Sequence, residues 1–63
     1  MIQLDLRSNQ PIYEQIVEQY KYLLIRGFLK KGDAIPSVRK LALELSITPG
    51  TVAKAYGELE RQG

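Results

Sequence analysis

Apolar residues in the second half of the chain recur with the spacing of two short amphipathic helices. Two sets of four fall at positions i, i+3, i+4 and i+7, which places their side chains on one helix face. They are Val38, Leu41, Ala42 and Leu45, followed by Val52, Ala55, Tyr56 and Leu59. Two helices that each carry one apolar stripe, joined by about three residues, must cross steeply to share a core, as in a helix-turn-helix. We therefore predict a helix over residues 37–46, a tight turn, and a helix over residues 48–62.

The first half of the chain predicts an extended arm followed by a long helix. Ile2, Leu4 and Leu6 alternate with polar residues, so we expect an arm over residues 1–8 with one buried face. A broad apolar stripe then predicts a helix over residues 10–27. Its members are Ile12, Tyr13, Ile16, Val17, Tyr20, Leu23, Leu24 and Phe28.

Polar residues and a proline mark the expected start of this long helix. Asn9 or Gln10 can cap it, and Pro11 suits the first helical position, where its missing N–H costs nothing. Tyr22 and Ile25 lie off the apolar stripe. These two side chains are expected to be exposed, either as scattered surface residues or as a contact for another domain or subunit.

Glycine and proline shape the connection between the first two helices. Gly27 ends the first helix, and residues 28–33 form a turn in which glycine supplies an unusual backbone angle. Residues 34–36 must be extended, because a residue that precedes proline avoids the α region. Two hydroxyl residues then serve as helix caps. They are Ser37 for the second helix and Thr48 for the third, which has Pro49 at its first position.

The composition is that of one small soluble domain. The 63 residues are 44% hydrophobic and 25% charged, with a net charge of +2, which is compatible with a nucleic-acid partner but does not require one. No apolar run is long enough to span a membrane and residues 1–7 lack a signal-peptide pattern, so a cytoplasmic protein is expected. With no Cys and no His, the usual zinc ligands and the commonest acid–base catalyst are missing. We therefore expect no metal, no cofactor and no enzymatic activity.

Two cations at the start of the second helix conflict with the local electrostatics. If Ser37 is the cap, Arg39 and Lys40 occupy the second and third helical positions, where the helix dipole favours acidic side chains. Each charge then costs the isolated helix about 0.3–1 kcal/mol. A phosphate at this helix end would reverse the effect, because backbone N–H groups, the Ser37 hydroxyl and the Arg39 guanidinium could all donate to it. The alternative is a solvated pair in which Lys40 bridges to Glu44.

The third helix is predicted to have a low, mildly basic outer face. Four residues lie opposite its apolar stripe, namely Gly50, Lys54, Gly57 and Arg61. Thr48 and Thr51 add small hydroxyls near the end that enters the major groove of DNA in helix-turn-helix proteins. Such side chains suit phosphate oxygens, base edges or thymine methyl groups. Lys54 could instead pair with Glu58, four residues later.

The remaining polar groups have structural explanations. Tyr13, Tyr20 and Tyr56 are expected to be core aromatics with a wet hydroxyl edge. The carboxylates fall on helix exteriors with no cleft to gather them. Asn, Gln and Arg, the side chains that make bidentate base contacts, are missing from the start of the third helix. Direct reading of bases is therefore expected to be sparse, with specificity from phosphate contacts and DNA shape.

Several motifs along residues 9–63 together resemble one family of bacterial regulators. They are Pro11-Ile12-Tyr13-Glu14-Gln15-Ile16, the Gly32-Asp33 turn, Pro36-Ser37-Val38-Arg39, Thr48-Pro49-Gly50-Thr51-Val52 and Ala55-Tyr56-Gly57-Glu58-Leu59-Glu60-Arg61-Gln62-Gly63. This combination is similar to the N-terminal winged helix-turn-helix domain of the GntR family, and the first motif points to its YtrA-type subgroup. The expected fold class is therefore mainly all-α, the three-helix core of a winged-helix domain. The wing hairpin and a C-terminal effector or dimerisation region would lie outside residues 1–63.

The resemblance implies a homodimer that grips a two-fold-symmetric, double-stranded DNA operator, with a possible small-molecule effector bound by the C-terminal region. It implies phosphate contacts from Ser37 and Arg39, and groove contacts from the start of the third helix. The DNA-binding residues expected there are Thr48, Pro49, Gly50, Thr51 and Lys54. The subgroup commonly carries Asn on both sides of the proline, where this chain has Thr48 and Gly50.

The expected function is sequence-specific binding of duplex DNA by a bacterial transcription regulator, most often a repressor. Two alternatives stay open. One is the headpiece of a MocR-type regulator, in which a similar domain precedes an aminotransferase-like domain. The other is a helix-turn-helix used as a protein-interaction module, which predicts no salt-dependent binding to duplex DNA.

Overall fold

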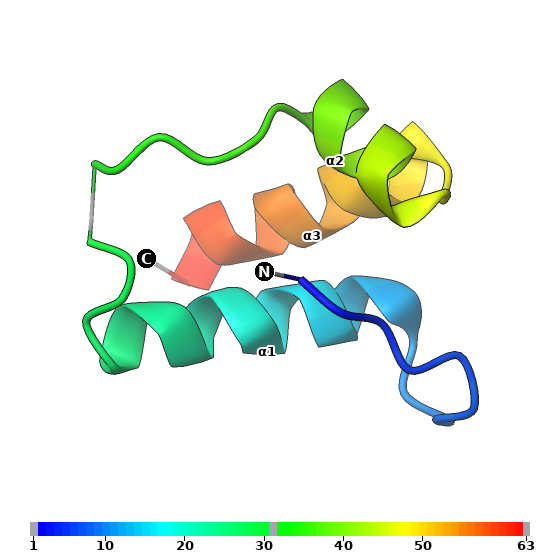
Figure 1. The fold of residues 1–63 in the computed structure, drawn as a ribbon, viewed down its shortest axis with the longest axis horizontal. Coiled ribbons are helices and arrows are strands. Elements are labelled where there is room, and N and C mark those ends of the chain that lie inside the picture. Colours follow the sequence, from blue (N-terminus) through cyan, green and yellow to red (C-terminus); the bar gives the residue numbers. More distant parts are fainter. Residues whose placement is uncertain (1, 31, 63) are drawn as a thin grey trace.

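Three α-helices make up the fold, in a computed structural model that describes residues 2–30 and 32–62. They are α1 (Ile12–Ile25), α2 (Val38–Leu45) and α3 (Pro49–Gln62), and the described residues contain no strand. The predicted three-helix, all-α fold is confirmed, and each helix lies inside its predicted range. α1 and α3 pack side by side and run in the same direction, while α2 lies across the first half of α3 (Figure 1). Within these residues, no helix combines the length and hydropathy that a membrane span requires.

The core lies between α1 and α3 and is closed by α2 and the N-terminal arm. Eight apolar side chains among the described residues are buried in it. They are Ile2, Ile16, Val17, Tyr20, Leu41, Ala42, Val52 and Ala55. The members from α2 and α3 all belong to the two stripes that predicted these helices, because such a stripe faces one partner surface. Burying a large apolar side chain contributes about 1.5–3 kcal/mol to stability. The stability of a domain this small therefore depends heavily on these few residues.

Tyr20, Tyr56 and the Pro36 carbonyl form a hydrogen-bond chain that joins α1, α3 and the residue before the α2 cap. The Tyr56 hydroxyl donates to the Pro36 carbonyl oxygen at 2.6 Å, and the Tyr20 and Tyr56 hydroxyl oxygens lie 3.3 Å apart. Because a hydroxyl has one proton and a carbonyl can only accept, Tyr20 must donate to Tyr56. The two rings meet edge to face, with their centroids 5.9 Å apart.

The expectation of a wet hydroxyl edge is wrong for Tyr20. Its side chain is only 1% exposed, and its hydroxyl bonds to Tyr56. Burial, followed by the hydrogen bond with Tyr56, raises the pKa of the Tyr20 hydroxyl above its ordinary value. The hydroxyl therefore keeps the proton that the hydrogen-bond chain requires.

Two glutamine side chains of α1 hold the N-terminal arm antiparallel to the helix. The Gln15 amide accepts from the Asp5 N–H at 2.8 Å and donates to the Asp5 carbonyl at 3.0 Å. Gln19 makes the same pair of hydrogen bonds with the backbone of Gln3. Residues i and i+2 of an extended chain lie about as far apart as residues i and i+4 of a helix. Gln3 and Asp5 of the arm can therefore both lie opposite their partners, Gln19 and Gln15. The arm thereby brings Ile2 into the core.

The start of α1 differs from the expectation. Pro11 stands at the N-cap position, the helix begins at Ile12, and no side chain caps it. Gln10 contributes its carbonyl oxygen instead, which accepts from Gln15 Nε2 at 3.0 Å. The predicted cap by Asn9 or Gln10 is therefore wrong, because the arm is tied to α1 through Gln15, which is only 5% exposed.

Three side chains that the pattern assigned to apolar faces are exposed. Leu6 is 80% exposed because it lies in a turn closed by the Ser8 N–H and the Asp5 carbonyl at 3.3 Å. Leu24 and Phe28 are exposed at the end of α1, where the chain turns away. Tyr22 and Ile25 are exposed, as predicted. Met1 of the predicted arm lies outside the described residues.

Glycines bend the connection between α1 and α2. Gly27 and Gly32 have φ angles of 78° and 95°, as expected for a turn that needs glycine. The Lys30 N–H donates to Asp33 Oδ2 at 2.8 Å, and the Asp33 N–H donates to the Lys30 carbonyl at 2.9 Å. Lys31, which the predicted turn includes, lies outside the described residues.

Backbone hydrogen bonds around Ser46 close the turn between α2 and α3. Ser46 has a φ of 57°, in the left-handed region. Its N–H donates to the Leu43 carbonyl at 3.3 Å, and the Ile47 N–H donates to the Ala42 carbonyl at 3.0 Å. These two bonds are those of a Schellman motif, which ends a helix and reverses the chain. The motif therefore sets the crossing of α2 and α3.

We predict that Tyr56→Phe destabilises the domain more than Tyr20→Phe. The first change leaves the buried Tyr20 hydroxyl without its acceptor, and we expect a loss of about 2–3 kcal/mol in the free energy of unfolding. The second leaves the bond from Tyr56 to Pro36 intact, so the loss should be about 1 kcal/mol. Urea denaturation followed by circular dichroism measures both. Equal losses would contradict the donor and acceptor roles given above.

Candidate nucleic-acid interface

The start of α2 presents hydrogen-bond donors to solvent. Ser37 is the N-cap, as predicted, and its Oγ accepts from the Lys40 N–H at 3.1 Å. A hydroxyl that accepts one bond still has its own proton to donate. Ser37 and Arg39 are both exposed. This helix end therefore offers backbone N–H groups, a hydroxyl proton and a guanidinium to an anion.

The two cations of this first turn have no carboxylate partner among the described residues. Within the described residues, the ion pair that forms is in α3 and joins Arg61 to Glu58. The Lys40–Glu44 bridge considered from the sequence is not formed within residues 32–62. α2 also has no acidic residue in its first turn. The unfavourable interaction of Arg39 and Lys40 with the helix dipole is thus left uncompensated inside the domain.

The start of α3 carries a pair of hydroxyls. Thr48, Pro49 and Gly50 are exposed and Thr51 is partly buried. The Thr48 and Thr51 hydroxyl oxygens lie 3.0 Å apart, so one donates to the other. Thr48 was expected to cap the helix through a backbone N–H, and its hydroxyl bonds to the Thr51 side chain instead. One proton of the pair remains free to donate outward.

A low surface continues along α3. Gly50, Ala53 and Gly57 are exposed and recur at i, i+3 and i+7, which places them on one face. A Cβ atom added to Gly50 or Gly57 would meet nothing within 4 Å. Packing inside the domain therefore does not require either glycine, although a glycine inside a helix costs about 1 kcal/mol relative to alanine. A face without side chains allows the backbone of α3 to approach a second molecule closely.

Lys54 lies over the ring of Tyr13 and not beside Glu58. Its Nζ is 4.2 Å from the ring centroid, within the range of a cation–π interaction. The Glu58 carboxylate accepts from Arg61 Nη2 at 2.6 Å and from Gln62 Nε2 at 3.0 Å. The hydrogen bond from Arg61, followed by that from Gln62, lowers the pKa of Glu58. The Lys54–Glu58 alternative is therefore wrong, and Arg61 is the cation of α3 that is neutralised.

The residues predicted from the sequence to bind DNA form two groups on the surface. Ser37 and Arg39 stand at the start of α2, and Thr48, Pro49, Gly50, Thr51 and Lys54 occupy the start and first two turns of α3. α2 and the start of α3 lie at the same end of the domain (Figure 1). α2 has eight residues. Such a helix is about 12 Å long, so the start of α2 lies about that far from the turn that leads into α3.

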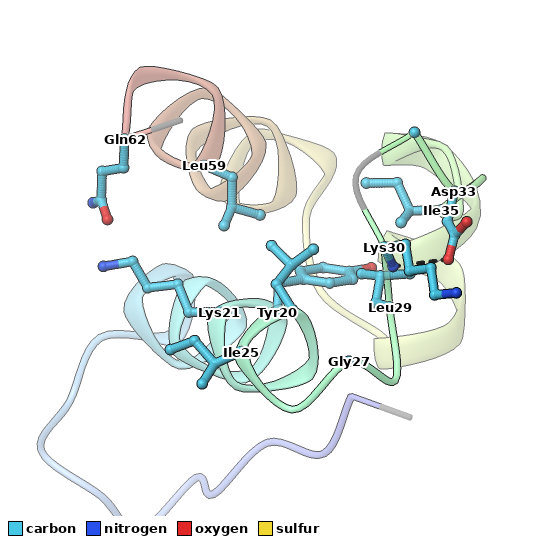
Figure 2. A pocket seen from close by; sticks show the side chains of 12 residues that line it. Tyr20, Lys21, Ile25, Gly27, Leu29, Lys30, Asp33, Ile35, Leu59 and Gln62 are labelled. Carbon is cyan, nitrogen blue, oxygen red and sulfur yellow. Dashed lines mark hydrogen bonds between the residues drawn. The ribbon is translucent and has the colours of Figure 1, made fainter.

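A second surface feature lies away from these residues. It is an open, mainly apolar pocket of about 770 Å³. Figure 2 shows Ile25 and Tyr20 of α1 and Leu59 of α3 along its wall, with Ile35 of the connection opposite. None of the seven predicted DNA-binding residues lines this pocket.

Residues 12–63 match the sequence model of the family described as "Bacterial regulatory proteins, gntR family". This chain belongs to the GntR family. It is 57% identical to the HTH-type transcriptional repressor YtrA of Bacillus subtilis over 63 residues, which are 100% of this chain and 48% of YtrA. It is 44% identical to the uncharacterized HTH-type transcriptional regulator YhcF of the same organism, over 90% of this chain and 47% of YhcF. The chain thus spans about half the length of these relatives.

The fold shows the same likeness as the sequence. YtrA from Sulfolobus acidocaldarius, described as a GntR-family transcription factor, superposes with a TM-score of 0.95 at 47% sequence identity. That comparison covers 98% of this chain and 53% of the other. The family and the YtrA-type likeness predicted from the sequence are both confirmed.

Sequence reasoning missed the roles of two α1 residues, one at this surface and one that holds the N-terminal arm. Tyr13 was expected to be a core aromatic, and it is partly buried but also contacts Lys54. No local signal reveals that contact, because the two residues meet only through the packing of α1 on α3. Gln15 could have been found, since Gln15 and Gln19 form an i, i+4 pair beside the apolar stripe and follow an extended arm that needs hydrogen-bond partners.

We predict that Gly57→Ala stabilises the free domain by about 1 kcal/mol, because the new methyl group enters open space and a helical glycine is removed. In a domain of this size the gain corresponds to a rise in Tm of about 4–8 °C. Gly50→Ala, in the first turn of α3, is the matched control and should give a smaller rise. Thermal melting followed by circular dichroism measures both, and a lower Tm for Gly57→Ala would show that the fold itself needs this glycine.

Proposed function

We propose that this chain is the DNA-binding domain of a bacterial transcription regulator. In this proposal the start of α3 enters the major groove and the start of α2 binds a phosphate. The observation that carries it is that both helix starts expose donors and neither has an acidic residue in its first turn. α1, by contrast, carries Glu14 in its first turn. Family membership and the names of the relatives support the same proposal.

A phosphate at the start of α2 would turn an unfavourable arrangement into a favourable one. Arg39 opposes the helix dipole in the free domain, but beside a phosphate it adds a charge-assisted hydrogen bond. The Ser37 hydroxyl already accepts from the helix and can donate its proton outward. Contacts of this kind fix the orientation of the domain on the duplex without reading its sequence.

The start of α3 suits close approach better than detailed base reading. Residues 48–55 include no Asn, Gln or Arg, the side chains that make bidentate contacts with bases. Thr48 and Thr51 offer hydroxyls and methyl groups, and Gly50 leaves space between them and a base edge. In this proposal, base recognition is confined to a few contacts of this type. DNA shape and deformability then supply much of the specificity.

We further propose that the full-length protein is a cytoplasmic homodimer that represses transcription from a two-fold-symmetric operator. One module of this size buries little surface on DNA, and dimeric helix-turn-helix proteins bind half-sites about one helical turn apart. The relatives are about twice as long as this chain, which leaves room for a dimerisation region outside residues 1–63. Such a region would also be the place for a small-molecule effector.

Two other functions are less well supported. A MocR-type parent would continue into an aminotransferase-like domain. This chain is instead 57% identical to YtrA, and the match covers 48% of the length of YtrA. A protein-interaction module gives no specific reason for two cations at a helix start without acidic residues, whereas a bound phosphate does. It also predicts binding that does not depend on salt in the manner of duplex DNA.

We predict that Arg39→Ala in the full-length protein weakens binding to operator and to nonspecific duplexes alike, by about tenfold at low salt. Because one phosphate contact is lost, the slope of log K against log salt concentration should fall in magnitude by about 0.9. Fluorescence anisotropy over a series of salt concentrations measures both quantities.

Arg26→Ala is the matched control for this experiment. Arg26 lies just after α1, with its guanidinium 5.8 Å from the Tyr22 ring centroid, and it is exposed like Arg39. Its loss should change affinity much less and leave the salt slope almost unaltered. An Arg39→Ala protein that binds as well as the unmodified protein would remove this residue from the interface.

A further inference from the structure

Tyr13 and Lys54 form a contact between the first turn of α1 and the second turn of α3. Lys54 Nζ lies 4.2 Å from the Tyr13 ring centroid. The ring itself is held in place, because Tyr13 is partly buried and packs against the core. A lysine side chain is otherwise free to adopt many rotamers. The contact therefore gives a flexible cation a defined position.

Lys54 is available to the ring because its competing partner is occupied. Glu58 lies four residues after Lys54, where it could form an i, i+4 ion pair. Its carboxylate instead binds Arg61 and Gln62. A lysine that precedes its glutamate is also the weaker orientation of such a pair. Among the residues that the structure describes, Lys54 therefore pairs with no carboxylate, whereas Arg61 pairs with Glu58.

Lys54 remains an exposed residue although its ammonium lies over the Tyr13 ring. Gly50 lies one turn before Lys54 and Gly57 lies almost one turn after it, so neither neighbour has a side chain to cover the ammonium. Helix side chains lean toward the N-terminus, which brings the ammonium toward the start of α3. The ring attracts the charge from one side, and the remaining N–H groups can still donate. A phosphate could therefore bind this ammonium without displacing it from the ring.

We infer that Tyr13 is a positioning residue for DNA binding, whose ring holds the Lys54 ammonium where it meets a DNA phosphate. This inference rests on the proposed function. Tyr13 itself need not touch DNA. It acts by fixing Lys54 before binding, which reduces the side-chain entropy lost when the phosphate is bound. The ring is expected to contribute about twofold to fivefold in affinity.

A double-mutant cycle in the full-length protein tests the coupling of the two residues. The probe is a mixed-sequence DNA duplex of about two helical turns, with Kd measured by fluorescence anisotropy over a series of salt concentrations. Lys54→Met should weaken binding and lower the magnitude of the salt slope by about 0.9. Tyr13→Leu should weaken binding about twofold to fivefold without changing this slope. In the Lys54→Met background, Tyr13→Leu should have no further effect.

Two controls separate positioning from a merely structural role. Tyr13→Phe keeps the ring and should restore most of the affinity that Tyr13→Leu loses. Lys30→Met removes an exposed charge near the end of α1 and reports the effect of net charge alone. Equal losses from Tyr13→Leu with and without Lys54 would overturn the inference but leave the proposed function standing. If the unmodified protein shows no salt-dependent binding to the duplex, the proposed function itself is overturned.

An NMR measurement without DNA tests the contact directly. Protons held above an aromatic ring resonate upfield, so the ε-methylene protons of Lys54 should be shifted upfield in the unmodified protein. The shift should persist in Tyr13→Phe and vanish in Tyr13→Leu. Unshifted resonances in the unmodified protein would overturn the inference whatever the DNA-binding result.

Discussion

The Tyr56 hydroxyl holds the start of α2 against α3. It donates to the Pro36 carbonyl at 2.6 Å, one residue before the α2 cap, and accepts from the buried Tyr20 of α1. All three helical elements are thus tied together by one chain of hydrogen bonds. The surface that we propose for DNA combines donors from two helix starts, and these can serve one duplex only if the helices keep a fixed orientation. The position of Ser37 therefore depends on a side chain that never reaches the surface site.

The spacing of apolar residues predicted the three helices because each helix packs one stripe against a single core. Leu41 and Ala42 of α2, like Val52 and Ala55 of α3, are buried at the positions the pattern indicated. The same pattern predicted too many buried residues at the end of α1. Phe28 continues the stripe in sequence, but the positive φ of Gly27 turns the backbone before Phe28 can join the core. Periodicity describes a helix only as long as the backbone remains helical.

The candidate site was predictable where a residue violates a local rule. Arg39 opposes the dipole of α2, Gly57 weakens α3, and neither conflict is relieved within the described residues. The partner of Lys54 was not predictable in this way. The i, i+4 rule considers one helix, whereas the outcome depended on Arg61 taking Glu58 and on a ring from α1. The hydrogen-bond chain through Tyr20 and Tyr56 was not predicted for the same reason. Its residues are far apart in sequence and meet only after α1 and α3 have packed.

The two halves of α3 differ in what they offer to a polyanion. The start of α3 has the exposed Thr48 before it, an exposed glycine at Gly50, and Lys54, which pairs with no carboxylate among the described residues. In the second half, Arg61 pairs with Glu58, and Glu60 adds an exposed negative charge. A duplex would therefore be attracted to the start of α3 and not to its length, so the helix should enter the groove by its end. Few base edges can be read in that geometry by a tip without Asn, Gln or Arg. Under the proposed function, specificity then depends on how easily a DNA sequence lets its phosphate backbone reach the starts of α2 and α3 at once. The hydrogen bond from Tyr56 to Pro36 helps to fix the position of one helix start relative to the other.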